Sequence, residues 1–165
     1  MITRRHAGQT GIAALIAALA TGHRTATAAG PAMAYEITKS PEDWKKLLTK
    51  EQFYVLREHG TERAGTSPLD KTYTAGMYHC AGCDLPLYSS ETKFDSGTGW
   101  PSFWKAVDNA VGTTVDKSFF MTRTEVHCRR CGGHQGHIFP DGPKPTGERH
   151  CINGVALKFI PKATT

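Results

Sequence analysis

Five cysteines carry most of the chemistry that this 165-residue sequence offers. Four of them form two C-x-x-C pairs, Cys80 with Cys83 and Cys128 with Cys131, and 44 residues lie between the pairs. Each pair places two sulfur atoms on one tight turn, and two such turns complete the tetrahedron of four thiolates typical of structural zinc. We therefore predict one structural zinc ion per chain. Disulfides or a redox-active pair are the alternatives, because disulfides form in exported proteins.

The fifth cysteine, Cys151, has no sulfur partner left if the other four bind zinc. A strand-like run follows it, so a buried core cysteine is one interpretation. A reactive thiol is the other, because Arg149 precedes it by two residues and an extended chain would place both on one face. A guanidinium there would lower the pKa of the thiol and favour the nucleophilic thiolate. Asn153 would share the same face.

Two histidines, His134 and His137, lie just upstream of this cysteine. A cysteine with histidines elsewhere in the fold is the pattern of an activated nucleophile. Taken singly, each histidine also fits a solvated loop or an alternative metal ligand. Asp141 precedes a glycine and fits a turn, and Trp100 fits a core position.

The elements that must position these residues are short. Ser40 followed by a proline and two acidic residues predicts a helix that runs through about Leu48. A capping-box pattern over 49–52 opens a second helix, which we expect to end near His59 with Gly60 as its breaker.

After a turn-rich loop over 61–73, the sequence is typical of β structure. Short runs rich in β-formers alternate with Gly, Pro and Asp clusters, at residues 85–88, 118–127, 136–139 and 155–160. Apolar and polar residues alternate in the second run, as a half-buried strand requires. The seventeen glycines and nine prolines also disfavour an all-helical fold. We predict a mainly β fold, with two small helices packed on an antiparallel core.

Residues 1–30 have the layout of a bacterial export signal. Two arginines precede an apolar run over 11–20, and an A-x-A site at 26–28 predicts cleavage near Ala28. The arginine pair partly matches a twin-arginine signal. The run is about half the ~20 residues that a spanning helix needs, so we expect a periplasmic protein without stable membrane insertion. A mitochondrial-type presequence or an uncleaved tail is the alternative.

The charge of the remaining chain excludes one class of partner. Without the first 30 residues, 17 Lys and Arg face 15 Asp and Glu, which is too weak an excess to indicate nucleic-acid binding.

Three stretches of the chain resemble the B-type methionine-R-sulfoxide reductases. They are CAGCDLPLYSSETKFDSGTGWPSFW at 80–104, TEVHCRRCGGHQGHIFPDGP at 124–143 and GERHCINGVALKF at 147–159. The resemblance covers roughly residues 40–161, and we assign the reductase domain to residues 35–162. It implies a tent of two antiparallel sheets with N-terminal helices, and a four-cysteine zinc site away from the chemistry.

The resemblance also implies a role for each candidate residue. Cys151 matches the nucleophile, His137 the acid or water-holding histidine, and His134 its companion in the active site. Trp100 matches the indole that receives the substrate methyl group. The network around the nucleophile and substrate is matched by Arg149, Asp141 and Asn153.

These roles imply an oxygen transfer from methionine sulfoxide in proteins or peptides to Cys151, which becomes a sulfenic acid. Many members of the family carry a second, resolving cysteine where this chain has Thr98. An external thiol, from a thioredoxin-like protein or a small molecule, is then expected to reduce the sulfenic acid. We expect a monomer. A non-enzymatic zinc-binding interaction module and a thiol peroxidase are the competing hypotheses.

Overall fold

The computed structural model describes residues 35–163. The predicted export signal over 1–30 lies outside the described residues. Within the described part of the chain, no helix has the length and apolar character needed to cross a membrane.

Both helices begin where the sequence indicates. Helix α1 (Pro41–Leu47) is capped by Ser40, and helix α2 (Lys50–Glu58) begins with a complete capping box between Thr49 and Gln52. The end of α2 corrects the prediction, because His59 rather than Gly60 adopts the left-handed conformation that stops the helix, with φ of 55°. Histidine is among the non-glycine residues that tolerate this conformation.

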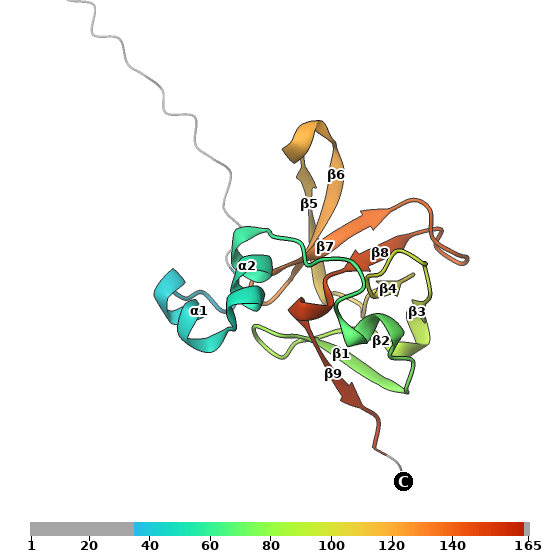
Figure 1. Ribbon diagram of the computed structural model, residues 1–165, viewed down its shortest axis with the longest axis horizontal. Coiled ribbons are helices and arrows are strands. Elements are labelled where there is room, and N and C mark those ends of the chain that lie inside the picture. Colours follow the sequence, from blue (N-terminus) through green and yellow to red (C-terminus); the bar gives the residue numbers. More distant parts are fainter. Residues whose placement is uncertain (1–34, 164–165) are drawn as a thin grey trace, which may run out of the picture. The chain divides into compact units, whose positions relative to one another are not determined.

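Within residues 35–163, nine strands form two antiparallel sheets, which confirms the mainly β fold with two short helices (Figure 1). The smaller sheet has the order β2-β1-β9 and contains β1 (Gly76–Cys80), β2 (Pro86–Ser89) and β9 (Leu157–Pro161). The larger sheet has the order β3-β4-β8-β7-β6-β5. Its strands are β3 (Lys93–Phe94), β4 (Ser102–Phe103), β5 (Val111–Asp116), β6 (Arg123–Cys128), β7 (His134–Phe139) and β8 (Arg149–Ile152).

The predicted strand over 118–127 is wrong in its first half. Residues Ser118–Phe120 form a 3₁₀ turn, and β6 begins only at Arg123. The apolar residues in this segment misled the prediction, because Phe120 and Met121 are exposed at the tip of the β5–β6 hairpin (Figure 1). The run over 155–160 likewise begins in a 3₁₀ turn, Gly154–Ala156, that precedes β9.

Three buried aromatic side chains join the two sheets. Phe103 on β4 stacks on Tyr88 of β2 with ring centroids 4.4 Å apart, and it meets the edge of Tyr78 on β1 at 5.0 Å. Large buried aromatic rings of this kind dominate the apolar contribution to stability. The hydroxyl of Tyr88 also lies 3.1 Å from Nδ1 of His150 on β8. This contact fixes the two faces of β8, since it turns His150 to the core and its neighbour Cys151 to the opposite side.

Candidate active site and metal centre

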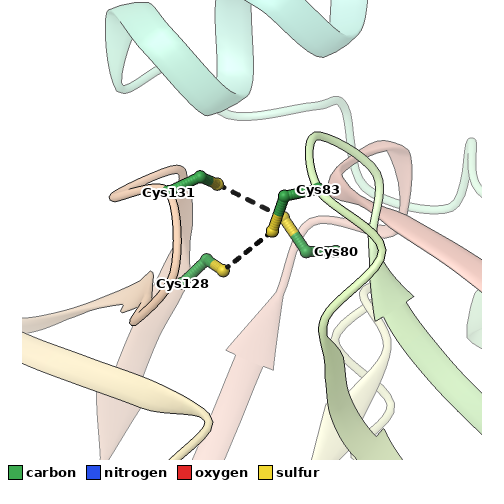
Figure 2. A group of neighbouring side chains, drawn as sticks. All are labelled: Cys80, Cys83, Cys128 and Cys131. Carbon is green, nitrogen blue, oxygen red and sulfur yellow. Dashed lines mark hydrogen bonds between the residues drawn. The ribbon is translucent and has the colours of Figure 1, made fainter. Parts of the chain in front are cut away.

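The four paired cysteines converge on one point (Figure 2). The Sγ atoms of Cys80 and Cys131 lie 3.8 Å apart, those of Cys83 and Cys128 lie 3.5 Å apart, and all four lie within 4.8 Å of one another. A tetrahedral zinc ion with Zn–S bonds of about 2.3 Å requires S–S separations of about 3.8 Å. A disulfide would require about 2.05 Å, and all five cysteines of the chain are free. The cluster can therefore hold one metal ion.

Side chains around this cluster donate hydrogen bonds to its sulfur atoms. Nη2 of Arg57 on α2 lies 3.3 Å from Sγ of Cys131, and the amide of Gln135 donates to Sγ of Cys80 at 3.6 Å. Such donors stabilise thiolates and orient them toward a metal. Because Cys80 ends β1 and Cys128 ends β6, an ion bound here would tie the smaller sheet to the larger one.

Cys151 lies on a different part of the larger sheet, in the middle of β8. It is in register with His137 on β7 and Ser102 on β4. Its side chain lines a cavity of about 140 Å³ together with Trp100, His137 and Asn153. Four residues singled out from the sequence therefore meet at one small cavity.

The glycine between the two histidines of His134-Gln135-Gly136-His137 is required for this close packing. A Cβ atom on Gly136 would lie 2.0 Å from the carbonyl oxygen of Cys151, which is far inside contact distance. Only glycine lets β7 and β8 approach closely enough to bring His137 beside Cys151.

The thiol of Cys151 corrects one expectation from the sequence. Burial raises the pKa of Cys151 above its ordinary value, although Arg149 and a hydrogen bond with Thr98 act in the lowering direction. The net shift is upward because burial removes water from around the thiolate and destabilises it by more than the guanidinium of Arg149 stabilises it. The resting form at neutral pH is therefore the neutral thiol, held beside a cation that favours its ionisation.

Asp141 and Arg149 form a two-pronged ion pair. Nε and Nη2 of Arg149 each donate to one carboxylate oxygen of Asp141 at 2.9 Å. The side chain of Asp141 is 60% exposed and does not line the Cys151 cavity. Its contact is with Arg149, whose guanidinium also stacks over the ring of Phe139 at 4.6 Å. Asp141 thus orients the cation that lies beside the thiol.

His137 has a carboxylate partner that the sequence analysis missed. Its Nε2 lies 2.9 Å from Oδ2 of Asp116 at the end of β5, and Arg123 donates to the same oxygen at 2.6 Å. Burial lowers the pKa of His137, and the hydrogen bond to Asp116 opposes this shift. No local motif marks Asp116, because its contact with His137 arises only when β5, β6 and β7 pair.

His134 lies beside this arrangement rather than on the cavity. It is buried, its Nδ1 lies 2.7 Å from Oε1 of Glu125, and its ring centroid lies 5.4 Å from that of His137. It lines a second, larger cavity of about 510 Å³, to which His137 also contributes. The structure therefore places His134 next to His137, and only His137 of the two lines the cavity that contains Cys151. Glu125 is a further partner missed from the sequence.

Glu62 connects Trp100 to the segment that follows Cys151. Its carbonyl oxygen accepts from the indole Nε1 of Trp100 at 3.1 Å, and its backbone N–H donates to Asn153 at 2.9 Å. Its carboxylate accepts from the backbone N–H groups of Gly154 at 2.6 Å and Val155 at 2.9 Å. Burial raises the pKa of this carboxyl group. No motif in the predicted loop over 61–73 indicated that Glu62 would connect these two segments.

Comparison with known proteins identifies the family. A family model described as the SelR domain matches residues 48–161. A relative from Leptospira interrogans, named peptide methionine sulfoxide reductase MsrB, is 55% identical over 77% of this chain and 98% of its own length. The chain belongs to the B-type methionine sulfoxide reductase family. Relatives of the same name from Agrobacterium fabrum and Methanosarcina mazei are each 52% identical, over 76% and 79% of this chain and 94% of their own lengths.

Membership of this family makes the chain an oxidoreductase. It therefore favours the reductase hypothesis over a non-enzymatic zinc-binding module. The two-sheet fold and the four-cysteine cluster agree with the features expected from the resemblance.

Proposed function

We propose that this B-type methionine sulfoxide reductase reduces methionine-R-sulfoxide in proteins and peptides, with Cys151 as the nucleophile. The observation that carries the proposal is the shared cavity, in which a thiol, an imidazole and an indole face one small volume. These are the three groups that the reaction needs: an attacking sulfur, a proton donor and an apolar surface for a methyl group.

In the proposed reaction, the sulfur of Cys151 attacks the electrophilic sulfur of the sulfoxide. His137 donates a proton to the sulfoxide oxygen, which would otherwise leave poorly. The attack joins the two sulfur atoms, and the proton lost by the thiol restores the one that His137 gives up. The protonated oxygen then passes from the methionine sulfur to the sulfur of Cys151 as the S–O and S–S bonds break, which releases methionine and leaves a sulfenic acid on Cys151. Sulfoxide sulfur is reduced by two electrons and cysteine sulfur is oxidised by two, so the step balances without a redox cofactor.

The asymmetry of the cavity supports selection of one epimer. Trp100 offers its indole face to the S-methyl group, while His137 and Asn153 supply polar groups elsewhere on the wall. Only one epimer can place its methyl group on the indole and its oxygen on the proton donor at the same time. The choice of the R epimer follows from the family.

Regeneration is proposed to need an external thiol. Many members of the family carry a resolving cysteine where this chain has Thr98, whose hydroxyl cannot form a disulfide. The effect of Thr98 on the pKa of the Cys151 thiol supports the proposal that the two side chains are neighbours. Two external thiols would reduce the sulfenic acid to the thiol, with release of water and formation of their own disulfide. We propose a thioredoxin-like protein or a small thiol as this reductant, with zinc in a structural role at the four-cysteine cluster.

We also propose that residues 1–30 direct export to the bacterial periplasm, where a monomeric reductase domain over 35–162 repairs oxidised proteins. The arginine pair, the short apolar run and the A-x-A site support this proposal. Mass spectrometry of the exported protein should find a mature N-terminus between residues 27 and 35. An exported, active protein that still begins at Met1 would disprove cleavage.

The reaction is tested with R- and S-sulfoxide methionyl peptides in the presence of dithiothreitol. We expect reduction of the R peptide only, and loss of this activity in Cys151→Ser, whose folding and zinc content are checked in parallel. A folded wild-type protein with a full complement of zinc that reduces neither peptide would refute the proposal.

A further inference from the structure

The larger cavity beside the active site contains a second group of metal-binding side chains. His59, Glu125 and His134 each offer one ligand atom, and these atoms lie within 4.8 Å of one another. Nδ1 of His59 lies 3.0 Å from Oε1 of Glu125, and Nδ1 of His134 lies 2.7 Å from the same oxygen. The three donors come from the residue that caps the end of α2, from β6 and from β7, and no two of them are adjacent in the sequence.

We propose that His59, Glu125 and His134 form a second, exchangeable site for a borderline divalent cation such as Ni²⁺ or Co²⁺. Two histidines and one carboxylate are a donor set that first-row transition metals prefer, with the remaining positions open to water. Bonds of about 2.1 Å in octahedral geometry require neighbouring ligand atoms to lie about 3.0 Å apart. The separations of 3.0 Å and 2.7 Å from Oε1 of Glu125 to the two histidines are already close to this value.

The surroundings of Glu125 prepare it to bind a cation. Its Oε2 accepts a hydrogen bond from Thr114 at 2.5 Å, which holds the carboxylate and directs Oε1 toward the two histidines. The pKa of Glu125 is lowered to about 2, chiefly by the hydrogen bond with His134, so this carboxylate is ionised at neutral pH. An oriented, ionised ligand with a partner on its second oxygen is typical of metal sites.

His59 gives the site an entrance. Its side chain is 66% exposed, whereas those of Glu125 and His134 are 12% and 2% exposed. The left-handed conformation of His59 at the end of α2 turns its imidazole from the helix toward Glu125. The adjoining cavity of about 510 Å³ has room for the water ligands of an ion. Its wall carries three carboxylates, Glu58, Asp116 and Glu125, against two cations, Lys117 and Arg123, which favours a positive occupant.

Occupation of this site is coupled to the chemistry through His134. Its ring lies 5.4 Å from that of His137, and both rings line the same cavity. A cation would replace the protons that both histidines donate to Glu125 and would add positive charge beside His137. Added positive charge makes protonation of His137 harder, so the loaded protein should transfer oxygen more slowly. This consequence rests on the proposed function, whereas binding of the cation does not.

Binding is measured by calorimetric titration of NiCl₂ into full-length, zinc-loaded protein in the Cys151→Ser background, which removes the reactive thiol as a ligand. We expect one Ni²⁺ per chain in addition to zinc, and at least a tenfold loss of affinity in His59→Asn. Asparagine tolerates the left-handed conformation, so the variant should keep its fold. His79→Asn, which changes a histidine on β1, is the matched control and should bind as before. Equal binding by the His59 and His79 variants would overturn the proposal.

Two further measurements separate the outcomes. Co²⁺ bound at the site should show weak ligand-field absorption without sulfur charge-transfer bands, and strong charge-transfer bands would place the ion on the cysteines and overturn the proposal. In a first turnover without added thiol, NiCl₂ should slow methionine release by the wild type and not by His59→Asn. If Ni²⁺ binds as expected but release is unchanged, the coupling to His137 is refuted.

Discussion

Asp116→Asn should shift the pH dependence of the first turnover. The carboxylate of Asp116 lies 2.9 Å from Nε2 of His137, and its charge favours the protonated imidazole. Asparagine keeps an oxygen that can accept this hydrogen bond and removes only the charge. The pKa of His137, already lowered by burial, should therefore fall further, and His137 should lose its proton at a lower pH.

The size of the shift follows from the distance and the screening. Two unit charges about 4 Å apart interact by about 4 kcal/mol at an effective dielectric constant of 20. The side chains of His137 and Asp116 are 12% and 20% exposed, and Arg123 shares the carboxylate, so much of this energy is screened or already compensated. A remainder of about 1.4 kcal/mol corresponds to roughly one pKa unit.

The assay is the rate of methionine release in a single turnover without added thiol, measured from pH 5 to pH 9. If protonated His137 is the donor and the Cys151 thiolate is the nucleophile, the rate is level between the lowered pKa of His137 and the raised pKa of Cys151. In Asp116→Asn the rise of the rate from low pH should be complete about one unit lower, and the level rate should be about tenfold smaller. Asp108→Asn is the matched control, because Asp108 is exposed and pairs with Lys105 away from the cavity. An unchanged rise from low pH and an unchanged level rate in Asp116→Asn, with intact folding, would refute either the role of His137 or its dependence on Asp116.

Three further outcomes are expected. In Thr98→Cys, the introduced cysteine should form a disulfide with Cys151 after reaction with one equivalent of sulfoxide, as measured by intact mass under non-reducing conditions. A protein that instead retains one added oxygen would contradict this reasoning. Cys80→Ser should lose much of the ~10–16 kcal/mol of binding free energy with which structural zinc stabilises a fold. Circular dichroism should therefore show an unfolded chain, and a folded, zinc-free protein would contradict this. Glu62→Gln should weaken the hydrogen bonds from the backbone N–H groups of Gly154 and Val155, so the free energy of unfolding should fall by about 1–2 kcal/mol and KM should rise more than kcat falls. Glu91→Gln is the control, because Glu91 is exposed, and it should change neither quantity.

Features set by local sequence were predicted well. The caps at Ser40 and Thr49 act through residues three positions away, so the beginnings of both helices could be read directly. Each C-x-x-C pair is likewise a local turn. Alternation at 118–124 failed because the tip of the β5–β6 hairpin is exposed, and exposure depends on what packs against a segment.

Features set by strand pairing could not be predicted from the residues alone. The cavity forms because β7 and β8 place His137 opposite Cys151, a register that no short motif specifies. The carboxylates of Asp116, Glu125 and Glu62 each reach their partners across elements distant in the chain. The direction of the Cys151 pKa shift was also missed, because it depends on burial, whereas the sequence displays only the neighbouring Arg149.

The most direct test of the central claim is the mass of the protein after reaction with one equivalent of R-sulfoxide peptide in the absence of any thiol. We predict one released methionine per chain and one added oxygen, located by fragmentation on Cys151, which dithiothreitol then removes. Cys151→Ser should neither release methionine nor gain mass. Multiple turnovers without thiol, or methionine release with Cys151 unmodified, would contradict the account.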